Sequence, residues 1–147
     1  MQTFFTIGYQ AFSPSSFIDQ LQEHKIDLLL DVRDNPFSFQ KGFSKTPLRI
    51  LLEKFGIEYQ HRKEMGTPPN IRSMYKATGD PSKALLLYEQ HLSKHFELVD
   101  SLISLINSRR VCLLCLESDH NLCHRSVIAG RIKERMKWSL VNLKAMD

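Results

Sequence analysis

The segment Ile26–Val32 is an almost unbroken run of apolar side chains that ends in Asp31-Val32-Arg33. A strand with one face in water alternates apolar and polar residues, whereas a run without alternation indicates a strand covered on both faces. Such strands belong to parallel sheets, because the helices that connect parallel strands pack on the two faces. This run therefore predicts a sheet enclosed between two helix layers.

Extended and helical patterns alternate along the rest of the chain, which predicts a parallel, doubly wound sheet with right-handed crossovers. Ser13-Pro14 and Thr46-Pro47 are typical of helix starts. The fold class we expect is α/β, a single three-layer domain over residues 1–147 with a mainly parallel five-stranded sheet and helices on both faces. The other strands are predicted at 3–7, 57–61, 111–116 and 139–143, and the helices at 14–24, 47–55, 85–106 (as one helix or two) and 122–136, the last with Val127, Ile128, Ile132 and Met136 on its inner face.

Three of these strands are expected to end side by side. A strand order of 3-2-1-4-5, numbered along the chain, would bring Gly8, Asp31–Arg33 and Cys115–Arg125 to one edge of the sheet, where α/β proteins bind ligands. The irregular segment Arg62–Pro81 carries Gly and Pro at both ends, with a helical turn around 71–77. Its length predicts a lid or a specificity insert.

The composition narrows the class of protein. Lys and Arg number 20 against 16 Asp and Glu, and the pI of about 9.0 favours anionic partners without indicating a polybasic tail. No apolar run approaches the roughly 18 residues of a membrane span, and the first eight residues have no basic segment before a long apolar one. We therefore expect a cytoplasmic protein without a membrane partner. Its three cysteines, an odd number, do not indicate a disulfide framework.

The stretch Val111–Arg125 carries most of the chemically versatile side chains. It reads as a strand, a polar loop and the start of a helix, so its side chains lie where free helix amides attract anions. Two thiols, a carboxylate, an imidazole and a guanidinium fall within eleven residues: Cys115, Glu117, Cys123, His124 and Arg125.

Four short motifs resemble those of one family: Thr6-Ile7-Gly8, Asp31-Val32-Arg33 followed by Pro36, Gly56-Ile57-Glu58-Tyr59, and Cys115-x-Glu117 with Cys123-His124-Arg125. Together they resemble, in order and over most of the chain, the bacterial and archaeal family catalogued as domain of unknown function 488. The resemblance implies an α/β fold in a prokaryotic protein and no established reaction. The family often has Gly-His-Ser where this chain has Gly8-Tyr9-Gln10, and Leu-Gly-Gly where it has Met65-Gly66-Thr67, so any chemistry of that histidine is missing here.

Arg33 and Arg125 are the predicted anion ligands. Both lie at predicted strand-to-helix edges, where a guanidinium fork beside helix amides suits a bidentate grip on phosphate or carboxylate. The alternative is that Arg33 pairs with Asp31 or Glu117 and only supports this edge of the sheet.

The cysteines leave three readings open. Cys112 is expected in the core, whereas Cys115 near His124 or Arg125 could be a nucleophile with a lowered pKa; with the Asp-Val-Arg strand, it loosely resembles rhodanese-class sulfurtransferases. A zinc site of Cys115, Cys123 and His124 is disfavoured, because structural zinc needs four ligands at closer spacing and adjacent Cys-His residues seldom face one metal. We expect no metal and no cofactor.

Asp31 and Glu117 are candidate acid and base, and Glu117 is also a candidate nucleophile for cleaving an N-glycosidic bond. The alternative for Glu117 is a salt bridge to Arg33 or a helix-capping role, although Asp119 and Asn121 are better caps.

Two further groups have a structural and a functional reading. The basic helix face of Arg131, Lys133, Arg135 and Lys137 is either solvated or contacts nucleic acid. The aromatic side chains of Phe37, Phe39, Phe43 and Tyr59 either stack on a base or pack in the core.

The first hypothesis is an enzyme of nucleotide or nucleic-acid metabolism, a hydrolase or transferase, whose partner is an anionic small molecule or a nucleic acid. The alternatives are a non-catalytic nucleic-acid-binding module and a thiol-dependent protein for sulfur transfer or redox chemistry. The predicted catalytic residues are Asp31, Cys115, Glu117 and His124, and the predicted ligand-binding residues are Gly8, Arg33, Cys123 and Arg125.

Overall fold

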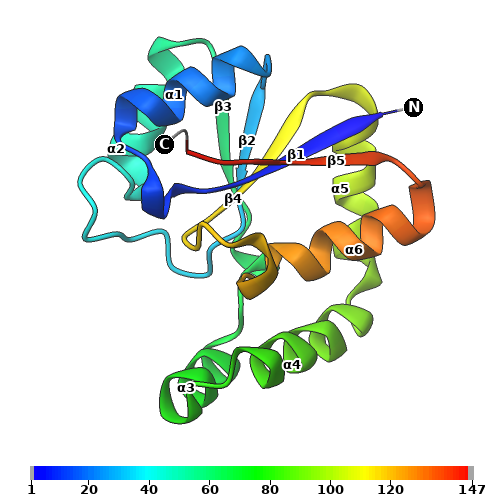
Figure 1. The fold of residues 1–147 in the computed structure, drawn as a ribbon. Coiled ribbons are helices and arrows are strands. Elements are labelled where there is room, and N and C mark those ends of the chain that lie inside the picture. The colour runs from blue at the N-terminus through cyan, green and yellow to red at the C-terminus, as the bar shows by residue number, and fades with distance from the viewer. Residues whose placement is uncertain (1, 146–147) are drawn as a thin grey trace.

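The structure, a computed structural model, describes residues 2–145 and contains one parallel sheet between helices (Figure 1). The strand order is β3-β2-β4-β1-β5, so the predicted order, which placed the first strand in the centre, is wrong. Apolar runs indicate which strands are interior but not which strands are neighbours, and both β1 and β4 have such runs. The strands are β1 (Thr3–Gly8), β2 (Leu28–Asp31), β3 (Glu58–His61), β4 (Val111–Cys115) and β5 (Ser139–Leu143).

The corrected order still brings the three expected strand ends together. β4 pairs with β2 on one side and with β1 on the other, with Asp31 opposite Leu114 and Gly8 opposite Cys115. β2 and β4 are direct neighbours, because the predicted intervening strand lies on the far side of β4. β3 lies at an edge of the sheet and is half exposed.

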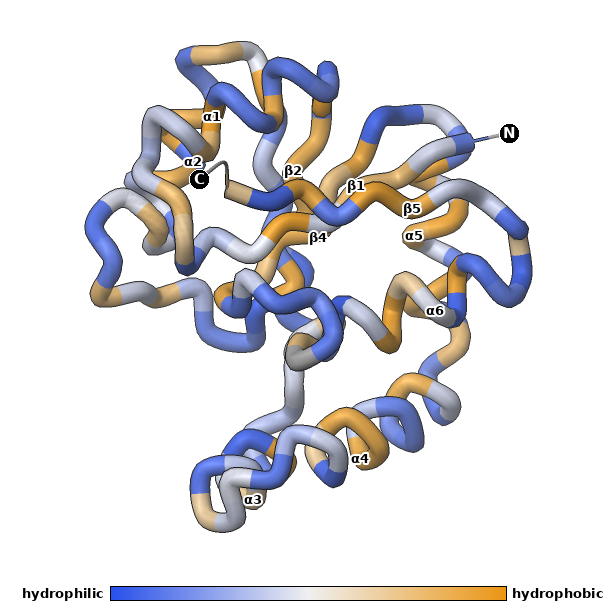
Figure 2. Tube along the Cα trace, viewed as in Figure 1, coloured by the Kyte–Doolittle hydropathy of each residue, from blue (hydrophilic) through white to orange (hydrophobic). Residues whose placement is uncertain are grey.

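Two apolar clusters fill the spaces on either side of the sheet. One packs α1 and α2 against Phe5, Leu29 and Leu114. The other packs α4, α5 and α6 against Leu28, Leu30 and Leu113. Figure 2 shows the interior strands as largely apolar and α3 as mostly polar. The six helices of the described residues are α1 (Pro14–Glu23), α2 (Lys45–Lys54), α3 (Pro69–Thr78), α4 (Pro81–Ser93), α5 (Phe96–Ser108) and α6 (Arg125–Met136).

The helix start predicted from the sequence is confirmed for α1 and is wrong for α2. Ser13 caps α1 by accepting a hydrogen bond from the Ser16 amide at 3.2 Å, as predicted. α2 begins at Lys45, so the predicted cap at Thr46 is wrong. Ser44 stands at the cap position, but its hydroxyl accepts from the Ser38 amide at 2.9 Å and so closes the loop that precedes the helix.

The segment predicted as irregular contains more helix than expected. α3 spans ten residues, Pro69–Thr78, and is followed by Gly79, whose φ of 66° suits glycine. Ile71, Met74 and Tyr75 recur at helical spacing, although only Ile71 is buried. The Gly and Pro residues at both ends of the segment favoured the prediction of an irregular stretch. α3 and α4 form a hairpin that extends below α6 in Figure 1, and the predicted long helix is two helices, α4 and α5.

α6 is held to the helices beside it by its basic side chains. Arg131 pairs with Glu89 at 3.2 Å, and Arg135 pairs with Asp100. Part of the predicted solvated or nucleic-acid-binding face therefore joins α4 and α5 to α6. Met136, predicted on the inner face, is 37% exposed, and Arg125 is buried with Ile128 and Ile132. In residues 2–145 no helix has the length and apolar character to cross a membrane.

Candidate functional site

The loop after β4 returns over the end of β1. A Cβ atom on Gly8 would lie 1.7 Å from the carbonyl oxygen of Glu117, so only glycine allows this approach. Arg125 holds the same carbonyl from the other side, donating a hydrogen bond at 2.7 Å. Gly8 and Arg125, both predicted to bind a ligand, thus position the loop that carries Glu117.

The β4 cluster consists of Cys115, Glu117, Cys123 and His124. Nδ1 of His124 lies 3.7 Å from the sulfur of Cys115 and 3.7 Å from the sulfur of Cys123. The two sulfurs and this nitrogen all lie within 4.8 Å of one another. The carboxylate of Glu117 adds an oxygen 3.4 Å from the Cys115 sulfur. The four residues were predicted as one site, and the fold brings them together.

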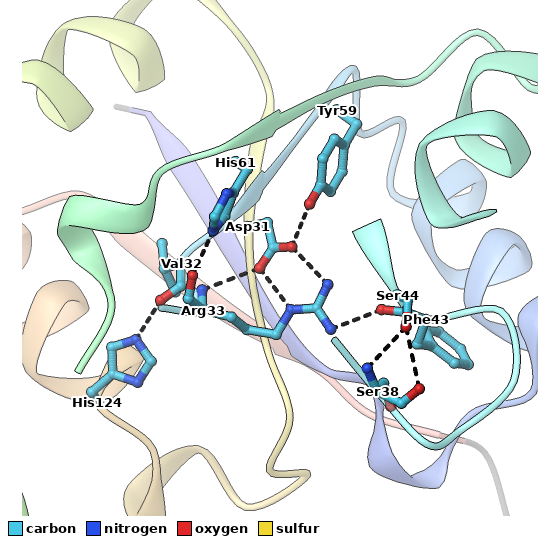
Figure 3. A network of polar contacts seen from close by, with 9 residues as sticks. All are labelled: Asp31, Val32, Arg33, Ser38, Phe43, Ser44, Tyr59, His61 and His124. Carbon is cyan, nitrogen blue, oxygen red and sulfur yellow. Dashed lines mark hydrogen bonds and ion pairs between the residues drawn. The ribbon is translucent and has the colours of Figure 1, made fainter. Parts of the chain in front are cut away.

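The backbone of β2 determines the tautomer of His124. Its Nε2 lies 2.7 Å from the carbonyl oxygen of Val32, which can only accept, so Nε2 carries the hydrogen (Figure 3). In the neutral ring, Nδ1 then has a free lone pair, and this is the atom that faces both sulfurs. Tyr88 of α4 packs edge-on against the ring, with centroids 5.0 Å apart.

In the β4 cluster, burial and the contacts between side chains shift the pKa values in different directions. A hydrogen bond from Cys123 and the neighbouring His124 hold the pKa of Cys115 well below its usual value, although burial opposes this shift. Burial and the Cys115 charge raise the pKa of Cys123 well above its usual value and also raise that of Glu117. Burial alone would lower the pKa of His124, but Cys115 raises it. Without a bound ion, the cluster favours a Cys115 thiolate beside an imidazolium.

A cavity of about 500 Å³ opens beside this cluster. Cys115, Glu117 and His124 line one wall, and the α3–α4 hairpin forms the opposite wall. The insert predicted from the sequence therefore lies over the predicted site. The hairpin residues that face the cavity were not among the predicted site residues, although the irregular segment was the signal for them; they include Arg72, Tyr75, Lys76 and Tyr88.

The β2 cluster consists of Asp31, Arg33 and Tyr59, whose polar groups bind one another (Figure 3). Arg33 also lines the cavity. Arg33 donates two hydrogen bonds to the Asp31 carboxylate, at 2.8 and 2.7 Å, and a third to the Phe43 carbonyl at 2.7 Å. The Tyr59 hydroxyl donates to the same carboxylate at 2.5 Å. Asp31 is fully buried, so its oxygens are used within the protein. This geometry favours the structural alternative for Arg33 and leaves Asp31 badly placed as an acid or base.

In the β2 cluster, the Asp31 carboxylate shifts the pKa values of Arg33 and Tyr59. Burial lowers the pKa of Arg33, but the Asp31 carboxylate outweighs it and raises the pKa above its ordinary value. Burial and the same carboxylate raise the pKa of Tyr59. Arg33 therefore stays protonated and charged near neutral pH, and Tyr59 stays protonated and neutral.

Arg125 is 1% exposed and keeps two nitrogens, Nε and Nη1, without a hydrogen-bond partner among the described residues. It is therefore a buried cation below the loop rather than a fork open to a phosphate. Of the four aromatic residues with two readings, Phe43 and Tyr59 are buried, Phe39 is exposed and Phe37 lines the cavity. Cys112 is fully buried in the core, as predicted.

Comparison with known proteins gives a family but no reaction. Residues 13–132 match the family model described as Domain of unknown function DUF488. No curated protein and no solved structure matches the chain. The match spans β2, β3, β4, the helices α1 to α5, and α6 as far as Ile132. The chain therefore belongs to the DUF488 family, the family that its motifs resemble.

Proposed function

We propose that this protein is an enzyme, a hydrolase or transferase, that acts on a small nucleotide-like or otherwise phosphorylated molecule in the cavity beside β4. One observation carries the proposal: a thiol, a carboxyl group and an imidazole, from Cys115, Glu117 and His124, lie side by side on the wall of a cavity of about 500 Å³. Ligand sites commonly have volumes of roughly 300–1,000 Å³ with a few convergent polar groups. Reactive groups gathered in such a cavity support catalysis more than simple binding.

The α3–α4 hairpin supports an anionic substrate. Arg72 and Lys76 lie four residues apart on α3, and both line the cavity. Asp34 pairs with Arg72 at 2.8 Å and offsets part of its charge. Lys76 is then the cation best placed to meet a phosphate, in place of Arg33 and Arg125, whose guanidinium groups are held by the protein itself.

The aromatic lining supports a substrate with a planar apolar part. Four aromatic side chains line the same cavity as the two cations: Phe37 and Tyr75 are exposed, and Tyr9 and Tyr88 are buried in its wall. A base or another ring can stack on Phe37 or Tyr75, while its phosphate reaches α3. A nucleotide combines both features.

A thermal-shift screen tests this proposal. Nucleoside phosphates and sugar phosphates are added to wild type, Lys76→Ala and Lys83→Ala; Lys83 lies on α4 and is a matched exposed lysine. We expect at least one phosphorylated ligand to stabilise wild type and Lys83→Ala but to stabilise Lys76→Ala less. The proposal fails if no ligand stabilises wild type, or if Lys76→Ala responds as wild type does.

A second candidate is a thiol-dependent enzyme in which Cys115 is the nucleophile. It is favoured by the orientation of His124, whose Nε2 is bonded to Val32 while Nδ1 faces the Cys115 sulfur at 3.7 Å. A nucleophile, a base and a group that orients the base are the usual parts of such a site. Iodoacetamide should then label Cys115 faster than Cys112, and equal protection of the two thiols would exclude this candidate.

The nucleic-acid-binding module has less support. Arg131 and Arg135, two of the four basic residues on which it relied, are paired with Glu89 and Asp100. Their charge is therefore partly offset on the face that was expected to meet nucleic acid.

A further inference from the structure

We propose that Cys115, Cys123 and His124 bind a zinc-class divalent metal ion with a fourth position open to the cavity. The binding site stands on its own geometry; only its catalytic use rests on the proposed function. If the ion is bound, it supplies the reactivity of the site, and Cys115 is a ligand and not a free nucleophile.

The two sulfur-to-nitrogen distances among the three donor atoms fit tetrahedral zinc. With Zn–S near 2.3 Å and Zn–N near 2.0–2.1 Å, tetrahedral angles separate sulfur and nitrogen ligands by about 3.6 Å and two sulfur ligands by about 3.8 Å. Both sulfur-to-nitrogen distances here are 3.7 Å, and the two sulfurs lie within 4.8 Å of each other. A single ion can therefore contact all three donors once side-chain rotation brings the two sulfurs closer by up to about 1 Å.

The backbone explains how adjacent residues reach one ion. Consecutive side chains point to opposite sides of a strand, which is why a neighbouring Cys-His pair was expected not to share a metal. Cys123 is extended, with φ −113° and ψ 144°, whereas His124 is helical, with φ −57° and ψ −21°. This change of conformation at the start of α6 turns both side chains toward Cys115.

The surroundings of His124 are those of a metal ligand. A ligating histidine usually donates its second ring N–H to a carbonyl or carboxylate, which holds the ring and fixes its tautomer. The bond from Nε2 to the Val32 carbonyl does this and leaves Nδ1 for the ion. The edge-on ring of Tyr88 limits the rotation of the imidazole.

The charges of the site also fit a divalent ion. With the ion bound, both sulfurs are thiolates and His124 is neutral, so the ion and the two sulfurs together are neutral. Starting from the Cys115 thiolate beside the imidazolium, binding releases two protons, one from His124 and one from Cys123. The Glu117 carboxylate adds one negative charge, and Arg125, buried below the loop without a carboxylate partner among the described residues, adds one positive charge. The ion, the two thiolates, the Glu117 carboxylate and the Arg125 guanidinium together carry no net charge, so no further counter-ion is needed.

The position of the cluster indicates a catalytic and not a structural ion. Structural zinc is enclosed by four protein ligands, whereas catalytic zinc has three and keeps one position for water or substrate. Cys115 and His124 line the cavity, while Cys123 is 1% exposed behind them. Glu117 lines the same cavity, and its carboxylate oxygen lies 3.4 Å from the Cys115 sulfur, so a carboxyl group stands beside the ligand set.

Metal analysis of the purified protein tests the inference. Untagged protein, prepared with reductant and without chelator, is titrated with Zn²⁺ and Co²⁺ and compared with Cys115→Ser, Cys123→Ser and Cys112→Ser. Cys112 is the matched control, because it is a buried cysteine of the same strand that packs in the opposite cluster. We expect one ion per wild-type and Cys112→Ser chain, with tetrahedral Co²⁺ d–d bands and sulfur-to-cobalt charge-transfer absorption.

Loss of one direct ligand should weaken binding by more than the roughly 10- to 100-fold that loss of a supporting partner costs. Because a ligand variant can fail to fold, zinc protection is measured on wild type as well: Zn²⁺ should slow alkylation of Cys115 and Cys123, and chelator should restore it. Stoichiometric binding with release of about two protons per ion would support the site.

Three outcomes would overturn the inference: no bound ion, binding unchanged in Cys115→Ser and Cys123→Ser, or alkylation of Cys115 that zinc does not slow. These measurements use no substrate, so their failure is separate from that of the phosphate-ligand screen. A ligand response without metal would leave the proposed enzyme with a thiol mechanism, and metal without a ligand response would remove the proposed substrate class alone.

Discussion

The carboxyl ends of β2 and β4 carry two polar clusters that the sequence predicts as a single site, yet their chemistry differs. In the β2 cluster, the Asp31 carboxylate accepts from both Arg33 and Tyr59, and all three side chains are buried. In the β4 cluster, Cys115, Glu117 and His124 line a cavity. Arg33 lines the same cavity, but each of its side-chain nitrogens already donates a hydrogen bond within the protein. Polar groups that satisfy one another stabilise a fold, while reactive groups left facing a cavity are available to a ligand.

The largest expected effect is the loss of protein stability when the β2 cluster loses its cation. Arg33→Met leaves the Asp31 carboxylate buried without its partner, which should lower the free energy of unfolding by about 3–5 kcal/mol in urea titrations. The control is Arg109→Ala, which breaks the exposed pairs with Asp27 and Glu58 and should cost less than about 1 kcal/mol. Similar losses in both variants would contradict the structural role of the β2 cluster.

The second prediction concerns the contact that joins β1 to the β4 loop. Gly8→Ala places a Cβ against the Glu117 carbonyl, so we expect a loss of about 1–3 kcal/mol from overpacking, together with weaker ligand and metal binding. Gly130→Ala is the control, because nothing lies within 4 Å of its Cβ position in α6. That variant should be more stable by roughly 0.5–1 kcal/mol. A Gly8→Ala protein that keeps wild-type stability and binding would show that the loop is free to move.

The third prediction compares two buried tyrosine hydroxyls, one at each cluster. Tyr59→Phe removes a bond to the Asp31 carboxylate and should cost about 1.5–3 kcal/mol, as bonds to charged groups do. Tyr88→Phe removes a bond to the Met65 carbonyl and should cost only about 0.5–1.5 kcal/mol. Chemical denaturation measures both, and the reverse order would indicate that Asp31 does not rely on Tyr59.

The fourth prediction is a pH dependence near the β4 loop. Burial, and then the charge of Arg125, lower the pKa of His120 to about 4, while an unfolded histidine titrates near pH 6.5. Between these values the unfolded chain binds the extra proton, so His120 makes stability fall as the pH drops from about 6.5 to 4, by at most about 1.4 kcal/mol per pH unit. Unfolding free energies across this range should fall less steeply in His120→Gln. An unchanged slope would contradict the depressed pKa.

The smallest effect is expected where the charges are exposed. Arg131→Ala removes the pair with Glu89 and the hydrogen bond to Ser93, and should cost at most about 1 kcal/mol. The loss should shrink in high salt, because exposed pairs are screened. If Arg131→Ala instead impairs a nucleic-acid interaction without changing stability, the basic face of α6 regains its functional reading.

Local patterns predicted much of the fold. The apolar runs at Ile26–Val32 and Val111–Cys115 identified interior strands, although β2 itself is the shorter Leu28–Asp31. The Ser13-Pro14 start of α1 is confirmed because capping depends on neighbours in the chain. The α3 helix was underestimated, because Gly and Pro residues flank this short segment and only Ile71 within it is buried.

The sequence predicted which residues gather at the site but not which of them support the fold and which are available to a ligand. Cys115, Glu117, Cys123 and His124 were chosen for their residue types and their place after a strand, and the fold brings them together. Nothing in the sequence spacing indicated that Cys123 and His124 would converge on Cys115, because that depends on two backbone conformations at the start of α6.

The sequence by itself determined an α/β sheet enclosed on both faces, its family, and the chemical groups at the ends of its strands. Those properties follow from apolar periodicity, capping and residue type, which act over a few neighbouring residues. Only the tertiary structure decided that β4 is the central strand of the sheet, that the Arg33 guanidinium is hydrogen-bonded to Asp31, and that residues of the α3–α4 hairpin line a cavity. Each depends on contacts between segments that are distant in the chain. Local patterns allow several arrangements of these segments, and the need to pair buried charges favours one of them.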